Sequence, residues 1–186
     1  MRSAIVVLAA AATLAAVVPA SLHAQAMPAP RRYTLAAGPA VVLDHAPPSM
    51  GAHLRGSVAA RAGLRPLNVV ADVYATRLFP GTETVFAPGP IGVRRAETQV
   101  GVGVSGQATL FPSRAVSPYL LAGAVLRHSS ATVSAEGESL KDTALQPDLL
   151  LGGGLSVRAG GRRLSLETRF YGGTTIYMPV TIGLTF

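Results

Sequence analysis

The sequence has no cysteine, no tryptophan and a single lysine, Lys141. Without cysteine, the chain can form neither disulfide bonds nor thiolate-based sites. Only 13% of the residues are charged, whereas a soluble domain usually carries about 25%. Hydrophobic residues make up 49% of the 186-residue chain. We therefore expect part of the surface to face something other than water.

The basic charge is spread along the chain. The formal net charge is +7, and nearly all of the positive charge comes from arginine. Nucleic-acid binding usually requires clustered Lys and Arg, but here the arginines stand as singles and pairs, and only 5% of the residues are aromatic. We expect no nucleic-acid partner, and an anionic lipid surface is the alternative for a basic chain.

Sites for metals, phosphates and cofactors are not indicated. The four histidines do not have the spacing of metal ligands, and one of them, His23, lies in the N-terminal segment described below. The run 152–154 (GGG) lacks the lysine and the following helix of a phosphate-binding loop. We expect neither a metal nor a cofactor.

The first 26 residues have the pattern of a secretory signal peptide. Arg2 supplies a positive start, Ile5–Val18 is a continuous apolar stretch, and Ala24–Ala26 (AQA) ends on small residues. The alternative, an N-terminal membrane anchor, would need about 20 apolar residues. We predict a signal peptide at 1–26, an exported domain at 27–186, and no later transmembrane helix.

From Tyr33 onward the sequence alternates between apolar and polar residues and is interrupted by Gly, Pro and Ser clusters, as strands and turns require. In the segment 162–171 (RRLSLETRFY), Leu and Phe lie mainly on one face, and Arg, Ser and Glu lie on the other. Eight strands are predicted, at 33–44, 51–61, 67–77, 97–111, 118–128, 147–158, 163–172 and 177–186.

The connections between these strands differ in length. Residues 62–66, 112–117 and 159–162 form short connections, whereas 78–96 and 129–146 are long and polar or rich in Pro and Gly. In an up-and-down meander, alternate connections lie at opposite ends. The pattern therefore predicts short turns on one rim and long loops on the other.

The segment 177–186 (YMPVTIGLTF) has one fully apolar face, running from Met178 to Phe186 at every second residue. In lipid, every backbone polar group must be paired within the protein, so a sheet can span only by closing on itself. Export, low charge, alternation and loop asymmetry predict an all-β protein, an eight-stranded antiparallel up-and-down transmembrane β-barrel of the outer membrane. A soluble periplasmic β-barrel with apolar residues inside is the alternative.

Over 33–186 the sequence resembles the small eight-stranded outer-membrane proteins related to outer-membrane proteins A and X. The most specific part is 180–186, where Val180, Ile182, Leu184 and Phe186 alternate. The resemblance implies that these four residues are the signal read by the barrel-assembly machinery. We also expect contact with periplasmic chaperones during biogenesis, a monomer, and surrounding outer-membrane lipid and lipopolysaccharide. An interfacial aromatic girdle would consist mostly of Tyr33, Phe111, Tyr119, Phe170 and Tyr171.

Four charged residues fall on predicted inward faces: Arg55, Asp72, Glu167 and Arg169. An eight-stranded barrel is only just wide enough to be filled by side chains, and an unpaired charge in an enclosed site costs several kcal/mol. We therefore expect these residues to pair in an interior charge network. A small passive pore is the alternative.

An enzymatic interpretation rests on His128 and Ser130, with Glu136, Glu138 or Asp142 as the orienting acid. The spacing is similar to that of outer-membrane lipid A deacylases, but the Asn that usually follows the Ser is Ala131 here. We expect a non-enzymatic protein with a structural or surface-interaction role and no catalytic residues. A lipid A-modifying hydrolase remains an alternative.

Overall fold

The computed structural model describes residues 32–43, 48–61, 67–87, 89–135, 138–173 and 176–186. The predicted signal peptide, residues 1–26, lies outside the described residues. In the part of the chain that is described, no helix is long and apolar enough to cross a membrane.

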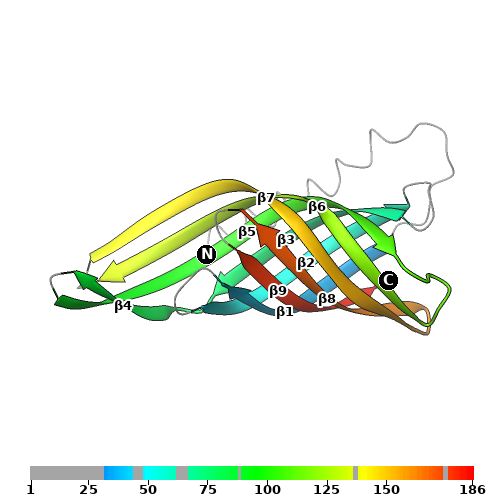
Figure 1. Ribbon diagram of the computed structural model, residues 1–186, viewed down its shortest axis with the longest axis horizontal. Coiled ribbons are helices and arrows are strands. Elements are labelled where there is room, and N and C mark those ends of the chain that lie inside the picture. The colour runs from blue at the N-terminus through cyan, green and yellow to red at the C-terminus, as the bar shows by residue number, and fades with distance from the viewer. Residues whose placement is uncertain (1–31, 44–47, 62–66, 88, 136–137, 174–175) are drawn as a thin grey trace.

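The described residues form one antiparallel sheet that closes into a barrel (Figure 1). The sheet has nine strands. One of them, β4, pairs only with β5 and is not part of the barrel wall. The other eight strands form the barrel, which is closed by the pairing of β3 with β5. The predicted eight-stranded up-and-down barrel is confirmed. The strands are β1 (Arg32–Val42), β2 (Ser49–Arg61), β3 (Leu67–Leu78), β4 (Gly81–Ala87), β5 (Gly89–Thr109), β6 (Val116–Ala135), β7 (Glu138–Ala159), β8 (Arg162–Gly172) and β9 (Tyr177–Thr185).

The first and last strands close the barrel against each other. Val42 is paired with Tyr177 and Thr34 with Thr185, and the Tyr33 amide donates to the Phe186 carbonyl at 3.1 Å. Residues 34–37 and 40–42 of β1 pair with β9, so most backbone groups along this seam are paired within the protein, as they must be in a bilayer.

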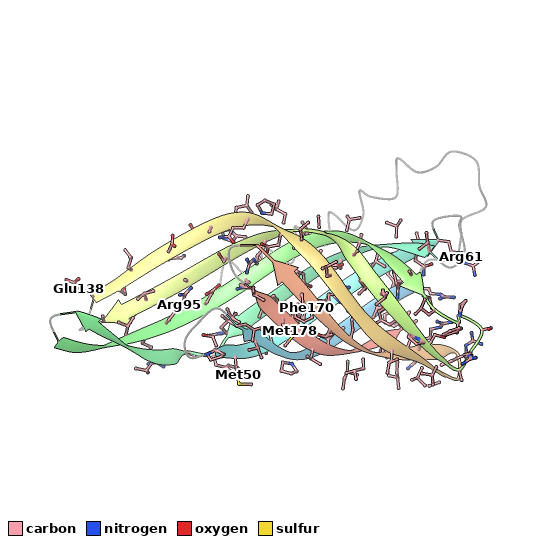
Figure 2. The ribbon with its side chains drawn as sticks, viewed as in Figure 1. Met50, Arg61, Arg95, Glu138, Phe170 and Met178 are labelled. Carbon is pink, nitrogen blue, oxygen red and sulfur yellow. The ribbon has the colours of Figure 1, made fainter. Side chains whose placement is uncertain are left out.

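The barrel has a polar interior and an apolar exterior. On β8, Glu167 and Arg169 are buried, while the alternating Leu166 is 52% exposed. On β9, Ile182 is 67% exposed, and Figure 2 shows Met50 of β2 pointing away from the barrel. A soluble barrel would have the opposite polarity, because its apolar side chains would fill the core.

The two long loops predicted at 78–96 and 129–146 are instead largely strands. Residues 81–87 and 89–97 form β4 and the start of β5, and 129–135 and 138–146 continue β6 and β7 far beyond the barrel (Figure 1). Outside a membrane both faces of a sheet can be wet, so these segments need no apolar alternation. That is why their sequences resemble loops.

The predicted aromatic girdle is wrong at two positions. Tyr119 and Tyr171 point into the barrel and are 4% and 0% exposed. Strand alternation places Tyr171 on the same face as the inward Glu167 and Arg169, and the hydroxyl of the inward Tyr119 donates a hydrogen bond to Glu167. Tyr33, Phe111 and Phe170 are exposed, as a girdle requires.

Candidate functional site

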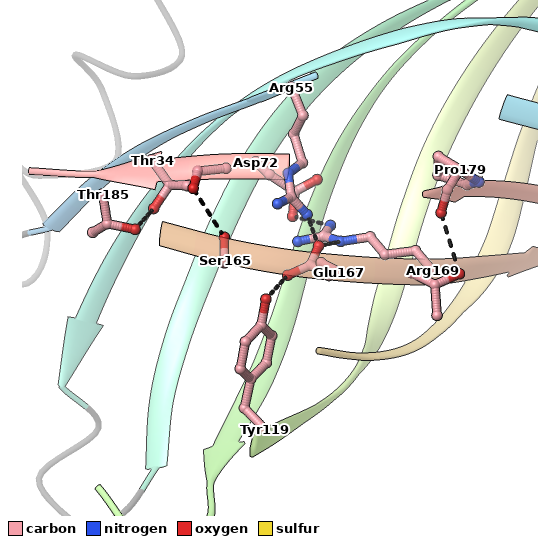
Figure 3. A network of polar contacts seen from close by, with 11 residues as sticks. Thr34, Arg55, Asp72, Tyr119, Ser165, Glu167, Arg169, Pro179 and Thr185 are labelled. Atoms are coloured by element: carbon pink, nitrogen blue, oxygen red, sulfur yellow. Dashed lines mark hydrogen bonds and ion pairs between the residues drawn. The ribbon is translucent and has the colours of Figure 1, made fainter. Parts of the chain in front are cut away.

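Glu167 is the centre of a charge network in the middle of the barrel (Figure 3). Its Oε1 accepts hydrogen bonds from Arg55 and, at 2.5 Å, from Nε of Arg169. Its Oε2 accepts from the hydroxyl of Tyr119 at 2.8 Å. Arg169 also donates to Oδ2 of Asp72 at 2.9 Å. The structure therefore brings all four charged residues of the predicted network together.

The network is assembled across the lumen. Arg55 lies on β2 and Asp72 on β3, whereas Glu167 and Arg169 are two residues apart on β8 and so share its inward face. Two guanidinium groups face two carboxylates, so the cluster is neutral. Neutrality and direct hydrogen bonds offset the desolvation of these buried charges.

A second buried ion pair joins β6 to β7 nearer the protruding strands. Nε of Arg127 lies 2.7 Å from Oδ2 of Asp148, and both side chains are almost fully buried. This pair is missed by the sequence pattern, because the Ala-, Gly- and Leu-rich strands that carry it alternate too weakly to assign their faces.

An aromatic layer lies between the two charge clusters. The rings of Tyr74 and Tyr171 are 5.1 Å apart, and those of Tyr171 and Tyr177 are 5.3 Å apart. Nδ1 of His53 lies 2.8 Å from the Thr76 hydroxyl and 2.7 Å from the Tyr177 hydroxyl. These side chains fill the cross-section of the lumen, since Tyr171 and Tyr177 are fully buried.

The interior as described contains no continuous channel. A cavity of about 90 Å³ opens at the end with the short turns and reaches inward as far as Glu167 and Arg169. Arg55, Glu167 and Arg169 of the charge network form its inner end, and the tyrosines of the aromatic layer do not line it. The lumen is therefore plugged by side chains, as expected for an eight-stranded barrel.

We expect the purified protein to show no stable conductance steps in planar lipid bilayers, even at high protein loading. An ion would have to cross the Arg55–Glu167–Arg169 cluster, whose members are each 5% exposed or less. A porin reconstituted in the same way provides the positive control. Reproducible steps that scale with protein concentration would show that the plug opens.

The His128 and Ser130 constellation is not assembled. Both residues lie on one face of β6, as positions two apart in a strand do. Asp142 is paired with Ala131, which follows Ser130 and faces the other way, and Asp142 therefore lies on the opposite face of the sheet. Glu138, paired with Ala135, also lies on that opposite face. Glu136 lies outside the described residues.

No group of His, Asp and Glu residues in the described part of the chain could hold a metal ion.

The predicted assembly signal lies on β9 and just after it. Val180, Ile182 and Phe186 face outward and are 39%, 67% and 58% exposed, and Leu184 alternates with them. Its recognition by assembly machinery stays a prediction.

Comparison with known proteins bears on the fold. No family model and no curated protein matches the sequence. The solved structure of Neisserial surface protein A matches with a TM-score of 0.57 and 16% identity, over 83% of this chain and 95% of that one. This chain has the fold of the small outer-membrane β-barrels.

Two further structures support the same fold. Ail, the attachment invasion locus protein of Yersinia pestis, matches with a TM-score of 0.53 and 15% identity, over 83% of this chain and 98% of that one. A major outer-membrane protein of Thermus thermophilus gives 0.54 and 12%, over 84% and 99%. The similarity covers nearly the whole length of each solved chain.

Proposed function

We propose that this protein is an outer-membrane barrel without an open pore that displays a protruding sheet at the cell surface as an interaction platform. The observation that carries the proposal is the strand register. Pairing of β3 with β5 ends at Arg77 and Thr98, and pairing of β7 with β8 ends at Leu149 and Gly172. Strands β5, β6 and β7 nevertheless continue well beyond these points.

The outer surface of the barrel supports a place in the membrane. Leu54, Leu149 and Leu151 are each at least 60% exposed, a costly arrangement in water but a favourable one in acyl chains. An N-terminal signal peptide at 1–26 would export the chain. Lipid would surround this apolar band, and the exposed Arg77 at the protruding end of β3 would face lipopolysaccharide phosphates.

The protruding sheet contains β4 and the outer parts of β5, β6 and β7 (Figure 1). Among the described strands, only β6 pairs with the segment Glu138–Leu145, so the other edge of that segment is open. Leu140 and Leu145, on opposite faces, are 71% and 64% exposed. An open edge with accessible apolar side chains is a site where an extended partner segment can add as a strand.

The names of two similar barrels agree with a surface role. One is a Neisserial surface protein and another is an attachment invasion locus protein. In outer-membrane barrels the short turns face the periplasm and the longer connections face the outside. By that rule the sheet formed by β4–β7 lies outside the cell.

Lys141 allows this orientation to be tested, since it is the only lysine in the chain and lies exposed near the tip of β7. We expect an amine-reactive polyethylene glycol too large for porins to label the protein on intact cells and to shift its gel mobility. The K141R variant is the matched control, because arginine keeps the charge but does not react. Labelling of Lys141 only after the outer membrane is permeabilised would contradict the proposal.

A variant with a shortened protruding sheet, compared with the wild-type protein, tests the interaction role. Residues 131–142 can be replaced by an Asn-Gly turn, because Ser130 and Thr143 are directly paired and a two-residue turn can join them. We expect this variant to stay folded and reach the surface but to reduce attachment of expressing cells to epithelial cells or to one another. Equal attachment by both proteins at equal surface levels would favour a purely structural role.

A further inference from the structure

The end of the barrel that carries the short turns has a mouth lined by arginines. Four arginines lie at this end, at inward positions of four different strands, because each is an even number of residues from a buried side chain in its own strand. They are Arg32 on β1, Arg61 on β2, Arg158 on β7 and Arg163 on β8. Figure 2 shows Arg61 at this end of the molecule, opposite Glu138.

These arginines have no acidic partners among the described residues. Arg158 and Arg163 are directly opposite each other in the β7–β8 register, and the charges of Arg32 and Arg158 both repel Arg163. Like charges that face each other across strands are destabilising. In the described part of β8 the nearest carboxylate is Glu167, and it is already occupied by Arg55, Arg169 and Tyr119.

The mouth leads into the cavity of about 90 Å³. Arg32, Arg61 and Arg163 line its outer part, with Asn68 among its neutral polar neighbours, and Arg55 lines it deeper in the barrel. Arg55 is only 3% exposed, yet its Nε has no hydrogen-bond partner. A single water molecule needs about 10–15 Å³ of such cavity volume, so the cavity has room for a small tetrahedral anion.

We propose that this mouth binds a phosphate group. Guanidinium groups present planar pairs of donors that match phosphate oxygens, and charge-assisted bonds of this kind are the strong ones. A bound phosphate would neutralise the excess positive charge at the mouth, where Arg158 and Arg163 face each other without an acidic partner among the described residues. The phosphate belongs either to a small solute or to a lipid headgroup at this rim. In the proposed orientation the mouth faces the periplasm, but binding does not depend on any role of the protruding sheet.

The test is a titration of the detergent-folded protein with inorganic phosphate in phosphate-free buffer, followed by the Nε–Hε resonances of ¹⁵N-labelled arginine. We expect saturable shifts of the Arg32, Arg61 and Arg163 signals. In the R61Q/R163Q variant the affinity, followed at the remaining Arg32 signal, is expected to fall by a factor of about ten or more. R114Q is the matched control, because Arg114 lies at the same end, stacks on Phe111 at 4.7 Å and does not line the cavity. Gel mobility of unheated samples checks that all variants are folded.

Nanodiscs separate the two sources of phosphate. If the site takes a solute, inorganic phosphate will give the same shifts in detergent, in phosphatidylcholine and in phosphatidylglycerol. If it takes a headgroup, phosphatidylglycerol alone will shift Arg61 and Arg163 and will block added phosphate. No saturable shift with either phosphate or phosphatidylglycerol would overturn the proposal, as would equal affinity in R61Q/R163Q and wild type.

Discussion

Replacing Glu167 with glutamine is expected to destabilise the folded barrel by about 3–5 kcal/mol, the usual cost of breaking a buried ion pair by removing one partner. The carboxylate accepts hydrogen bonds from Arg55, Arg169 and Tyr119. Its loss leaves two buried guanidinium groups with only Asp72 to balance them. The measurement is urea unfolding of the refolded protein in lipid vesicles, followed by far-ultraviolet circular dichroism, because the chain has no tryptophan.

Two further variants separate charge imbalance from lost packing. In Arg55→Met/Glu167→Leu both partners of one ion pair are gone and the Arg169–Asp72 pair stays balanced, so we expect much of the stability to return. Arg95→Gln breaks a pair whose arginine is 41% exposed and is expected to cost less than about 1 kcal/mol. An unfolding midpoint of E167Q equal to that of wild type would show that the network does not hold the barrel together.

Replacing Gly38 with valine is expected to prevent the barrel from closing. A Cβ at Gly38 would collide with the backbone carbonyl oxygen of Val180 and lie 2.9 Å from Cα of Thr181, both on β9. Those atoms belong to the backbone, so the clash can be relieved only by moving β1 away from β9, where the barrel closes. Overpacking within a core typically costs about 1–3 kcal/mol, and here it would also break ladder hydrogen bonds.

The readout for Gly38→Val is the fraction of protein that folds from urea into detergent micelles and migrates as a compact band before heating. We expect little or no compact band, whereas Gly172→Ala is expected to fold like wild type, because nothing lies within 4 Å of an added Cβ at that glycine. A normal compact band for Gly38→Val would mean that the β1–β9 seam adjusts without loss.

The architecture was predictable from the sequence because a lipid environment imposes a strict period of two on each membrane-spanning strand. Segment 162–171 shows this alternation clearly, and the structure places its leucines outside and Glu167 and Arg169 inside. Closure into a barrel followed from the need to pair every backbone group. Because burying an unpaired charge is unfavourable, the inward charged residues were likewise expected to form ion pairs with residues of opposite charge.

Other features had no readable signal in the sequence. Segment 129–146 resembles a loop because its strands protrude beyond the lipid, where neither face must be apolar. The inward positions of Tyr119 and Arg127 could not be predicted, because their strand alternates weakly and a shift of one residue exchanges the two faces.

The sequence by itself determined the class of fold, the apolar exterior and the presence of charges inside the barrel, because these depend on local alternation and on the solvent outside. Only the tertiary structure decided which charges meet, how far β5–β7 extend, and that Arg32, Arg61, Arg158 and Arg163 gather at one mouth without an ion-pair partner among the described residues. These features depend on strand register and on contacts across the lumen, which join residues far apart in the chain.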